Sequence, residues 1–332
     1  MRFWVGLMLL VLTGCASARS SDLALVRVPV ADLRSTPAAR AQGGSIHDDD
    51  QESQLLFGER VRIIEQRGGW ARVAALEQAE FSHNQRWEGY PGWVPLSVLY
   101  PVRAFPKPSL VVVHSWARAW QDAALSKPHS LRLPIGTQLT AVSSTTRAWG
   151  VRTPDGSVVW LDRDDAHMLA KQASLTTEER RSTIVDAAKT FIGMQYLWGG
   201  RSPHLASVPT TGVDCSSLVG LAYRTAGMQL PRDAHEQAMR ARPVKRPQPA
   251  DLIFLSAKNN PRRIVHVMLV DKGDDLIEAP GTGLAVRRIS SHERLGASLA
   301  KIKPGSTVNG QTVTFGSYFS DSHLSDSSRS GS

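Results

Sequence analysis

Hydrophobic and polar residues alternate over short stretches throughout the first half of the chain, and Gly or Pro residues separate these stretches. The pattern occurs twice: Gly58 precedes Trp70 by 12 residues, and Gly136 precedes Trp149 by 13. A period of two is typical of strands that bury one face, and the breaks are typical of turns. Two small antiparallel β-barrels with tryptophans in their cores are therefore expected. They span residues 22–102 and 107–172.

After about residue 173 the apolar positions take a helical spacing. Thr176 and Glu179 match a capping box, and the apolar residues behind them predict a helix over 176–193. A second helix is expected over 214–226, because Gly227 is a typical C-terminal stop. Apolar strands are predicted over residues 251–255, 264–270, 276–279 and 284–289. Helices followed by strands predict an α+β domain over residues 176–305. The Ser-rich segment 317–332 is expected to be disordered.

The first fifteen residues have the layout of a secretory signal. Arg2 supplies a positive start, ten apolar residues follow, and small residues lead to Cys15. This ending resembles a bacterial lipobox, which implies that residues 1–15 are a lipoprotein signal peptide and that Cys15 carries the lipid anchor. Ala16 follows the cysteine, and by the same resemblance this favours the outer membrane, facing the periplasm. The alternative is a buried N-terminal helix with an inert thiol.

Composition excludes several classes of protein. The 332 residues are 42% hydrophobic and 21% charged, so the chain is not disordered throughout. No apolar run reaches the roughly 20 residues of a spanning helix, which excludes a polytopic membrane protein. Two cysteines 200 residues apart exclude a disulfide framework and a Cys-rich metal site. The net charge of +9 suits an anionic envelope; no nucleic-acid partner is expected, because the basic residues near Arg240 lie among prolines without aromatics.

Cys215 lies at the start of its predicted helix, directly after Asp214. Helix N-termini and nearby imidazolium groups favour a thiolate nucleophile, although a lone cysteine is more often a small buried hydrophobic residue. His266 lies inside an apolar strand and is the candidate base. No cofactor or metal is expected, since His235-Glu236 has no further His at the spacing of a zinc helix.

Strand pairing brings a carboxylate towards this histidine. If residues 271–275 form the turn, residue 270 pairs with 276, and Glu278 lies on the face of His266 about 7–8 Å away. A slip by one residue would place Glu278 on the other face. A carboxylate there would orient the imidazole and stabilise its charged form. Cysteine, histidine and orienting residue follow in the papain-like order.

Several motifs together resemble the NlpC/p60 family of papain-like cell-wall cysteine peptidases, over about residues 176–305. The motifs are Tyr196-Leu197-Trp198-Gly199-Gly200-Arg201-Ser202, Val213-Asp214-Cys215-Ser216, Leu230-Pro231-Arg232-Asp233, Asp251-Leu252-Ile253-Phe254 and His266-Val267. The two repeats ahead of them resemble bacterial SH3 domains. The whole arrangement is similar to γ-D-glutamyl-L-diamino acid endopeptidases of the dipeptidyl-peptidase VI group.

This resemblance implies roles for individual residues. Cys215 is the expected nucleophile, His266 the base and Glu278 the third catalytic residue. The backbone N–H of Cys215 and the side chain of Tyr196 are expected to stabilise the oxyanion. Among the implied substrate contacts, Asp214, Glu59 and Tyr90 would bind the free amine of an N-terminal L-alanine; for Glu59 and Tyr90 the alternative is a solvated turn residue and a barrel aromatic. The implied substrate-binding residues are Asp214, Ser216, Glu59, Tyr90, Trp198 and Arg201.

Three positions depart from the family pattern. Glu278 stands where the family usually has His, Ser217 replaces the usual Gly after Cys-Ser, and the stretch 204–211 is longer than expected. The function expected is hydrolysis of the γ-D-glutamyl–diamino acid bond in peptidoglycan peptides, by a protein held to the membrane by its lipid. The alternatives are an endopeptidase on intact peptidoglycan and a catalytically silent wall-binding lipoprotein.

Overall fold

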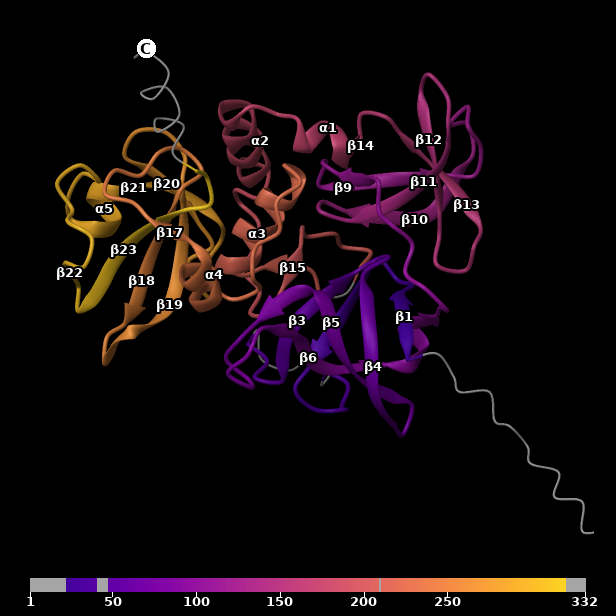
Figure 1. The fold of residues 1–332 in the computed structure, drawn as a ribbon, viewed down its shortest axis with the longest axis horizontal. Coiled ribbons are helices and arrows are strands. Elements are labelled where there is room, and N and C mark those ends of the chain that lie inside the picture. The colour runs from indigo at the N-terminus through magenta and orange to yellow at the C-terminus, as the bar shows by residue number, and fades with distance from the viewer. Residues whose placement is uncertain (1–21, 41–46, 209, 321–332) are drawn as a thin grey trace, which may run out of the picture.

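The computed structural model describes residues 22–40, 47–208 and 210–320, which form two N-terminal antiparallel sheets followed by a unit of helices and a third sheet (Figure 1). Cys15 and residues 321–332 of the expected tail lie outside these ranges. Within the described ranges, none of the helices combines the length and the hydrophobicity that crossing a membrane requires.

The first sheet contains seven strands in the order β3-β2-β6-β5-β4-β1-β7. Along most of the strand Trp70–Glu80, buried residues alternate with partly buried or exposed ones, as the period of two in the sequence predicts. A 3-10 turn, Leu96–Val98, precedes the last strand. The strands are β1 (Leu23–Val26), β2 (Val30–Arg34), β3 (Gln51–Leu56), β4 (Arg60–Arg67), β5 (Trp70–Glu80), β6 (Glu88–Pro95) and β7 (Leu99–Pro101).

The second sheet repeats the order of the first, with every strand seven places further along: β10-β9-β13-β12-β11-β8-β14. The sequence repeat therefore corresponds to a structural repeat. Neither sheet closes into a barrel, so that part of the prediction is not confirmed; the edge strand β3 is covered instead by the chain at Arg201. The strands are β8 (Leu110–Val112), β9 (Trp116–Trp120), β10 (Pro128–Pro134), β11 (Gln138–Ser144), β12 (Ala148–Arg152), β13 (Val158–Asp162) and β14 (Ala166–Met168).

The C-terminal unit contains helices on a six-strand path, β17-β23-β18-β19-β20-β21, with β22 paired to β23. The helices are α1 (Leu169–Ala173), α2 (Thr177–Lys189), α3 (Cys215–Thr225), α4 (Ala234–Arg240) and α5 (Ser291–Leu295). The seven strands of this sheet are β17 (Arg242–Pro243), β18 (Leu252–Ala257), β19 (Asn260–Val270), β20 (Asp275–Glu278), β21 (Arg287–Ser290), β22 (Thr307–Val308) and β23 (Gln311–Ser317). A separate two-stranded sheet pairs β15 (Arg201–Ser202) with β16 (Gly212–Val213).

The predicted helices and strands of this unit occur at the expected places with shifted ends. The segment expected to be disordered begins too early, however. Ser317 ends β23, and Phe319 is buried with its ring centroid 6.1 Å from that of Tyr223. The hydrophobic contact with α3 therefore extends the packed chain beyond residue 317.

One hydrophobic core joins all three parts. Helices α2 and α3 pack with strands β18 to β20, and Leu56 of the first sheet and Ile135 of the second unit are buried in the same cluster. The turn at Gly136 has φ +83°, and a Cβ there would lie 2.8 Å from the side chain of Leu221 in α3. Only glycine permits this approach, so the second N-terminal sheet packs closely on the helix that begins with Cys215.

Candidate active site

Cys215 is the first residue of α3, and its side chain is largely buried. Asp214 caps the helix: its Oδ1 accepts a hydrogen bond from the Ser217 N–H at 2.8 Å, while Ser217 Oγ accepts one from the Asp214 N–H at 3.0 Å. Ser217, the residue that departs from the family pattern, thus completes a capping box. The cap fixes the thiol at the positive end of the helix dipole, where a thiolate is favoured.

His266 and Glu278 come from neighbouring strands in the register that the sequence predicts. Leu269 pairs with Ile277 and Val270 with Leu276. Glu278 is fully buried at the end of β20, and its Oε2 accepts a hydrogen bond from His266 Nε2 at 2.8 Å. The imidazole also forms a side-chain hydrogen bond with Cys215, which leaves its other nitrogen, Nδ1, for the thiol.

Two arginines hold the buried carboxylate of Glu278. Arg287 of β21 donates to Oε1 from Nε at 3.0 Å and from Nη2 at 2.7 Å, and Arg294 of α5 donates to Oε2 at 3.0 Å. Burial opposes ionisation of Glu278, but His266 and the two arginines lower its pKa to about 2. Burial likewise opposes the imidazolium, but the hydrogen bonds and charges of Cys215 and Glu278 raise the pKa of His266 to about 9.

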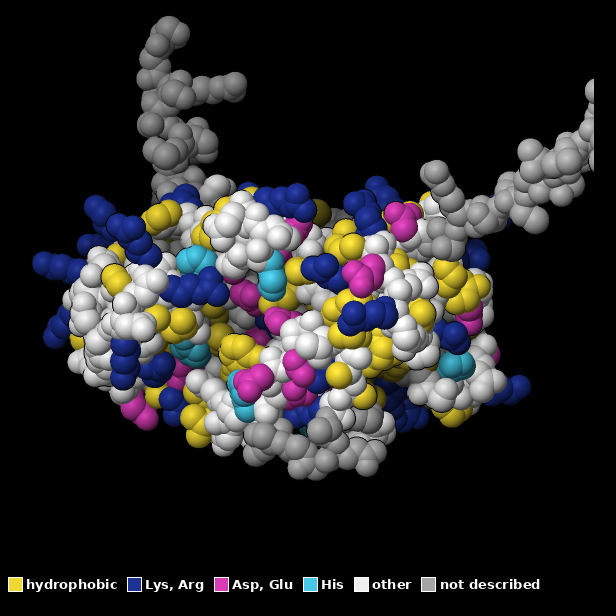
Figure 2. Space-filling view, turned by 90° about the horizontal axis from the view of Figure 1, so that it is seen from below, with side chains coloured by type: hydrophobic (Ala, Val, Ile, Leu, Met, Phe, Trp, Pro, Cys, Tyr) yellow, Lys and Arg dark blue, Asp and Glu magenta, His cyan; other side chains and the backbone are white. Residues whose placement is uncertain are grey.

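A cavity of about 520 Å³ opens at Cys215 and His266, between the first sheet and the C-terminal unit. Acidic and histidine side chains gather about the middle of the face in Figure 2. Tyr196 lines the cavity, and burial together with the nearby Asp214 raises the pKa of its hydroxyl, which stays a hydrogen-bond donor. Trp198 lines it as well, with its indole 45% exposed.

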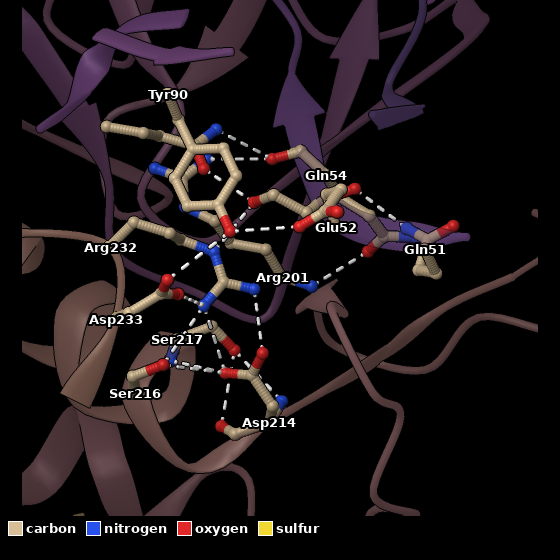
Figure 3. Close-up of polar contacts among 12 residues, drawn as sticks. Gln51, Glu52, Gln54, Tyr90, Arg201, Asp214, Ser216, Ser217, Arg232 and Asp233 are labelled. Atoms are coloured by element: carbon tan, nitrogen blue, oxygen red, sulfur yellow. Dashed lines mark hydrogen bonds and ion pairs between the residues drawn. The ribbon is translucent and has the colours of Figure 1, made fainter. Parts of the chain in front are cut away.

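One end of the cavity combines residues of two domains. The hydroxyl of Tyr90 on β6 shares its one proton between Glu52, at 3.1 Å, and Asp233, at 3.3 Å, as Figure 3 shows. All three side chains line the cavity. Burial raises the pKa of Asp233 to about 6, although Arg232 lies beside it. Carboxylates around a phenol form a site suited to an ammonium group.

Asp214 lines the cavity but is already occupied by other donors. Arg232 Nη2 donates to its Oδ2 at 2.7 Å, and the hydroxyl of Ser216 donates to its Oδ1 at 3.1 Å (Figure 3). Arg232 also donates to Ser53 Oγ of the first sheet at 2.6 Å. Asp214 therefore holds the helix start and the domain interface together, and Ser216 lines the cavity beside the thiol.

Glu59 and Arg201, both expected to contact substrate, do not line the cavity. They form a buried ion pair with Glu59 Oε1 2.8 Å from Arg201 Nη1, and Arg224 of α3 lies 3.1 Å from the same oxygen. With Glu59 2% and Arg201 5% exposed, neither can reach a ligand. Their charges compensate each other in the interface between the first sheet and α3. The expectation that Glu59 and Arg201 bind substrate is therefore corrected.

The long stretch 204–211 is also placed away from the chemistry. The carbonyl of Thr210 accepts a hydrogen bond from Gln54 of β3, and none of the described residues of this stretch lines the cavity. Sequence reasoning gave no role to Glu52, Arg232 or Asp233. The motif Leu230-Pro231-Arg232-Asp233 could have pointed to Arg232 and Asp233. No sequence motif marks Glu52, because its place beside Tyr90 depends on strand pairing. Among the described residues, no group of three or more His, Cys, Asp or Glu side chains is arranged to hold a metal ion.

Comparison with known families and proteins finds matches in both parts of the chain. Residues 193–296 match the NlpC/P60 family, and residues 45–79 match the bacterial dipeptidyl-peptidase SH3 domain. A γ-D-glutamyl-L-lysine dipeptidyl-peptidase of Bacillus cereus is 27% identical over 69% of this chain and 67% of its own. One of Bacillus subtilis is 26% identical over 76% of this chain and 80% of its own.

A solved structure shares the fold. The crystal structure of an NlpC/P60 family protein from Bacillus cereus superimposes with a TM-score of 0.68, at 23% identity, over 81% of this chain and 94% of that one. The range that matches the NlpC/P60 family contains Cys215, His266 and Glu278. The range that matches the SH3 domain contains strand β3. The chain therefore contains a cysteine peptidase domain of the NlpC/P60 family, preceded by a bacterial SH3 domain.

Proposed function

We propose that this peptidase hydrolyses the γ-D-glutamyl–diamino acid bond of peptidoglycan peptides that carry a free N-terminal L-alanine. One observation carries the proposal. The cavity that contains Cys215 and His266 ends at Tyr90, Glu52 and Asp233, where an ammonium group would meet two carboxylates and a phenolic oxygen. In intact peptidoglycan the same nitrogen is acylated and uncharged, so such an end favours free peptides.

The reaction begins with attack of the Cys215 thiolate on the γ-carbonyl carbon of the D-glutamyl residue. The N–H of Cys215 belongs to the first turn of α3, whose N–H groups have no partner within the helix. Together with the protonated hydroxyl of Tyr196 it stabilises the negative charge that develops on the carbonyl oxygen. The imidazolium of His266 then donates a proton to the leaving amine, and a thioester with Cys215 remains.

Hydrolysis of the thioester completes the cycle. Neutral His266 takes a proton from a water molecule that attacks the thioester carbon, and the L-Ala–γ-D-Glu dipeptide leaves as the thiolate re-forms. Glu278 keeps the imidazole oriented throughout and stabilises its charged form. The two arginines on Glu278 keep that carboxylate ionised.

The test is cleavage of L-Ala–γ-D-Glu–diamino acid peptides with free or N-acetylated L-alanine, with Cys215→Ala as the inactive control. Release of the dipeptide from the free peptide alone, abolished in the control, is expected. Equal turnover of both peptides would favour an endopeptidase on intact peptidoglycan. Binding to isolated cell walls without any turnover would favour a silent wall-binding protein.

We further propose that the mature protein is held at the outer membrane, facing the periplasm, by a lipid on Cys15. The support is the apolar run and the small residues that precede this cysteine. Partition of the expressed protein into a detergent phase, lost in Cys15→Ser, is the expected result. Partition into the aqueous phase by both forms would contradict the anchor.

A further inference from the structure

The catalytic cavity contains one arginine to which no role is assigned so far. Of the described residues that line the cavity, Arg263 is the one Lys or Arg; the acidic residues that line it are Glu52, Asp214 and Asp233. Its guanidinium donates from Nη1 to Ser82 Oγ at 3.0 Å and lies in the exposed part of the cavity. Since a guanidinium carries five N–H donors, others remain for a ligand.

A bulge in β19 lies between this side chain and His266. Leu255 pairs with His266, but the next residue, Ser256, pairs with Ile264, so Val265 is an extra residue in β19. Such a bulge interrupts the strict alternation of side chains along a strand. All four residues from Arg263 to His266 line the cavity, whereas Arg262 does not.

His235 adds a second donor beside Arg263. Its Nδ1 accepts a hydrogen bond from the Ile264 N–H at 3.3 Å. Burial and the charge of Arg263 lower the pKa of His235, so the ring is neutral and its proton is on Nε2. This ring lines the cavity as well. The two side chains therefore offer a cation and a neutral N–H on one wall.

This wall adjoins the end of the cavity where an ammonium group fits. Arg263 contacts Ser82, and the ring of the next residue, His83, packs edge-on against Tyr90 with centroids 5.1 Å apart. His235 lies in the first turn of α4, two residues after Asp233, which precedes the helix. A group bound at Arg263 would thus belong to the acyl part of the substrate, the part that stays on Cys215 after the amine has left.

We propose that Arg263, assisted by His235, binds the free α-carboxylate of the γ-linked D-glutamyl residue; this rests on the function proposed above. A γ-linked glutamate uses its side-chain carboxyl in the peptide bond, so its α-carboxylate stays free and charged. The carboxylates at the amine end would repel that charge unless a cation compensates it. The arrangement selects an acyl group with an ammonium and a carboxylate, and discriminates against the α-carboxamide analogue.

The test compares Arg263→Gln with wild type on two peptides that differ only in D-glutamate or D-isoglutamine at the γ-linked position. The variant should lose about 10- to 100-fold in kcat/KM on the D-glutamyl peptide, the range for one charge-assisted hydrogen bond, and change less than about threefold on the other. Arg262→Gln, the neighbouring exposed arginine outside the cavity, should leave both values unchanged.

The carboxylate bound by Arg263 could belong to the D-glutamyl residue or to the amino acid that leaves. Two substrates with different leaving groups distinguish these two sources. The selective loss in Arg263→Gln should be the same whether lysine or diaminopimelate leaves. A loss that appears only with diaminopimelate would assign Arg263 to the leaving group and overturn the proposal. Equal losses on the D-glutamyl and D-isoglutaminyl peptides, or no loss on either, would also overturn it. Failure of wild type to cleave any of these peptides would overturn the proposed function itself, and this assignment with it.

Discussion

His266 Nε2 donates a hydrogen bond of 2.8 Å to Oε2 of Glu278, a carboxylate that is fully buried and also bound by Arg287 and Arg294. The family usually has histidine at the position of Glu278. A neutral imidazole there could orient the catalytic histidine without adding a charge. The carboxylate adds one, and the two arginines compensate part of it. The pKa of His266 therefore depends on Cys215 and on Glu278, whose own charge the two arginines partly compensate.

Replacing Glu278 with Gln should lower activity and shift its pH dependence. Without the carboxylate the imidazolium loses a stabilising charge, so the pKa of His266 falls from about 9. We expect the alkaline limb of the kcat/KM profile to move to lower pH and the maximum to fall by about 10- to 100-fold. Arg287→Gln keeps the hydrogen bond to His266 and removes a positive charge beside Glu278, so it should not move that limb to lower pH. Identical alkaline limbs in wild type and Glu278→Gln would mean that Glu278 does not act through His266.

The same carboxylate should make folding stability depend on pH. The pKa of Glu278 is about 2 in the folded protein, below its usual value, so its contribution is present above about pH 4.5 and is lost as the pH falls towards 2. Urea unfolding should show up to about 3 kcal/mol more acid destabilisation in wild type than in Glu278→Gln over this range. Parallel losses of stability in both proteins would show that the charge of Glu278 does not stabilise the fold.

Asp233 should impose an acid limb on substrate binding. Burial raises its pKa to about 6, and only its ionised form attracts the ammonium group of a peptide. The KM for free-amine peptides should rise as the pH falls through about 6. In Asp233→Asn the KM should be raised by about tenfold or more at neutral pH. The rise in KM below about pH 6 should then be absent. If Asp233→Asn keeps the acid limb of wild type, the ammonium is bound elsewhere.

The interface between the first sheet and α3 should depend on Arg224. Its guanidinium is 1% exposed and pairs with both Glu59 and Glu77. Arg224→Met removes the buried cation that Glu59 and Glu77 share, leaving them only Arg201 and Arg60, and should lower the free energy of unfolding by about 3–5 kcal/mol. Arg60→Gln is the matched control, because Arg60 binds the same Glu77 from the surface and should cost less than about 1 kcal/mol. Equal effects of the two variants would contradict a role for burial.

The elements around the nucleophile could be predicted because local rules govern them. The capping residue Asp214 marks the start of α3, and a turn over residues 271–275 sets the pairing of Val270 with Leu276. Both depend on short stretches of chain. Closed barrels were expected from the alternation and the turns and are not found; the edge strand β3 instead meets Arg201 of β15, far along the sequence.

The substrate end of the cavity depended on contacts that no local pattern contains. Glu52 lies in β3 and Glu59 in the turn that follows it. Two buried arginines hold Glu59 in the interface, whereas Glu52 lies beside Tyr90. The bulge at Val265 is likewise visible only as a shift of register, and residues 263–266 around it all line the cavity.

By itself, then, the sequence determined the repeat, the helix that begins at Cys215, the strand with His266 and the face on which Glu278 lies. Periodicity, capping and turn length act within a few residues of the chain, so they can be read along it. Only the tertiary structure decided which charged groups face the substrate and which neutralise one another. Burial and ion pairing between domains control that outcome, and they join residues more than a hundred positions apart.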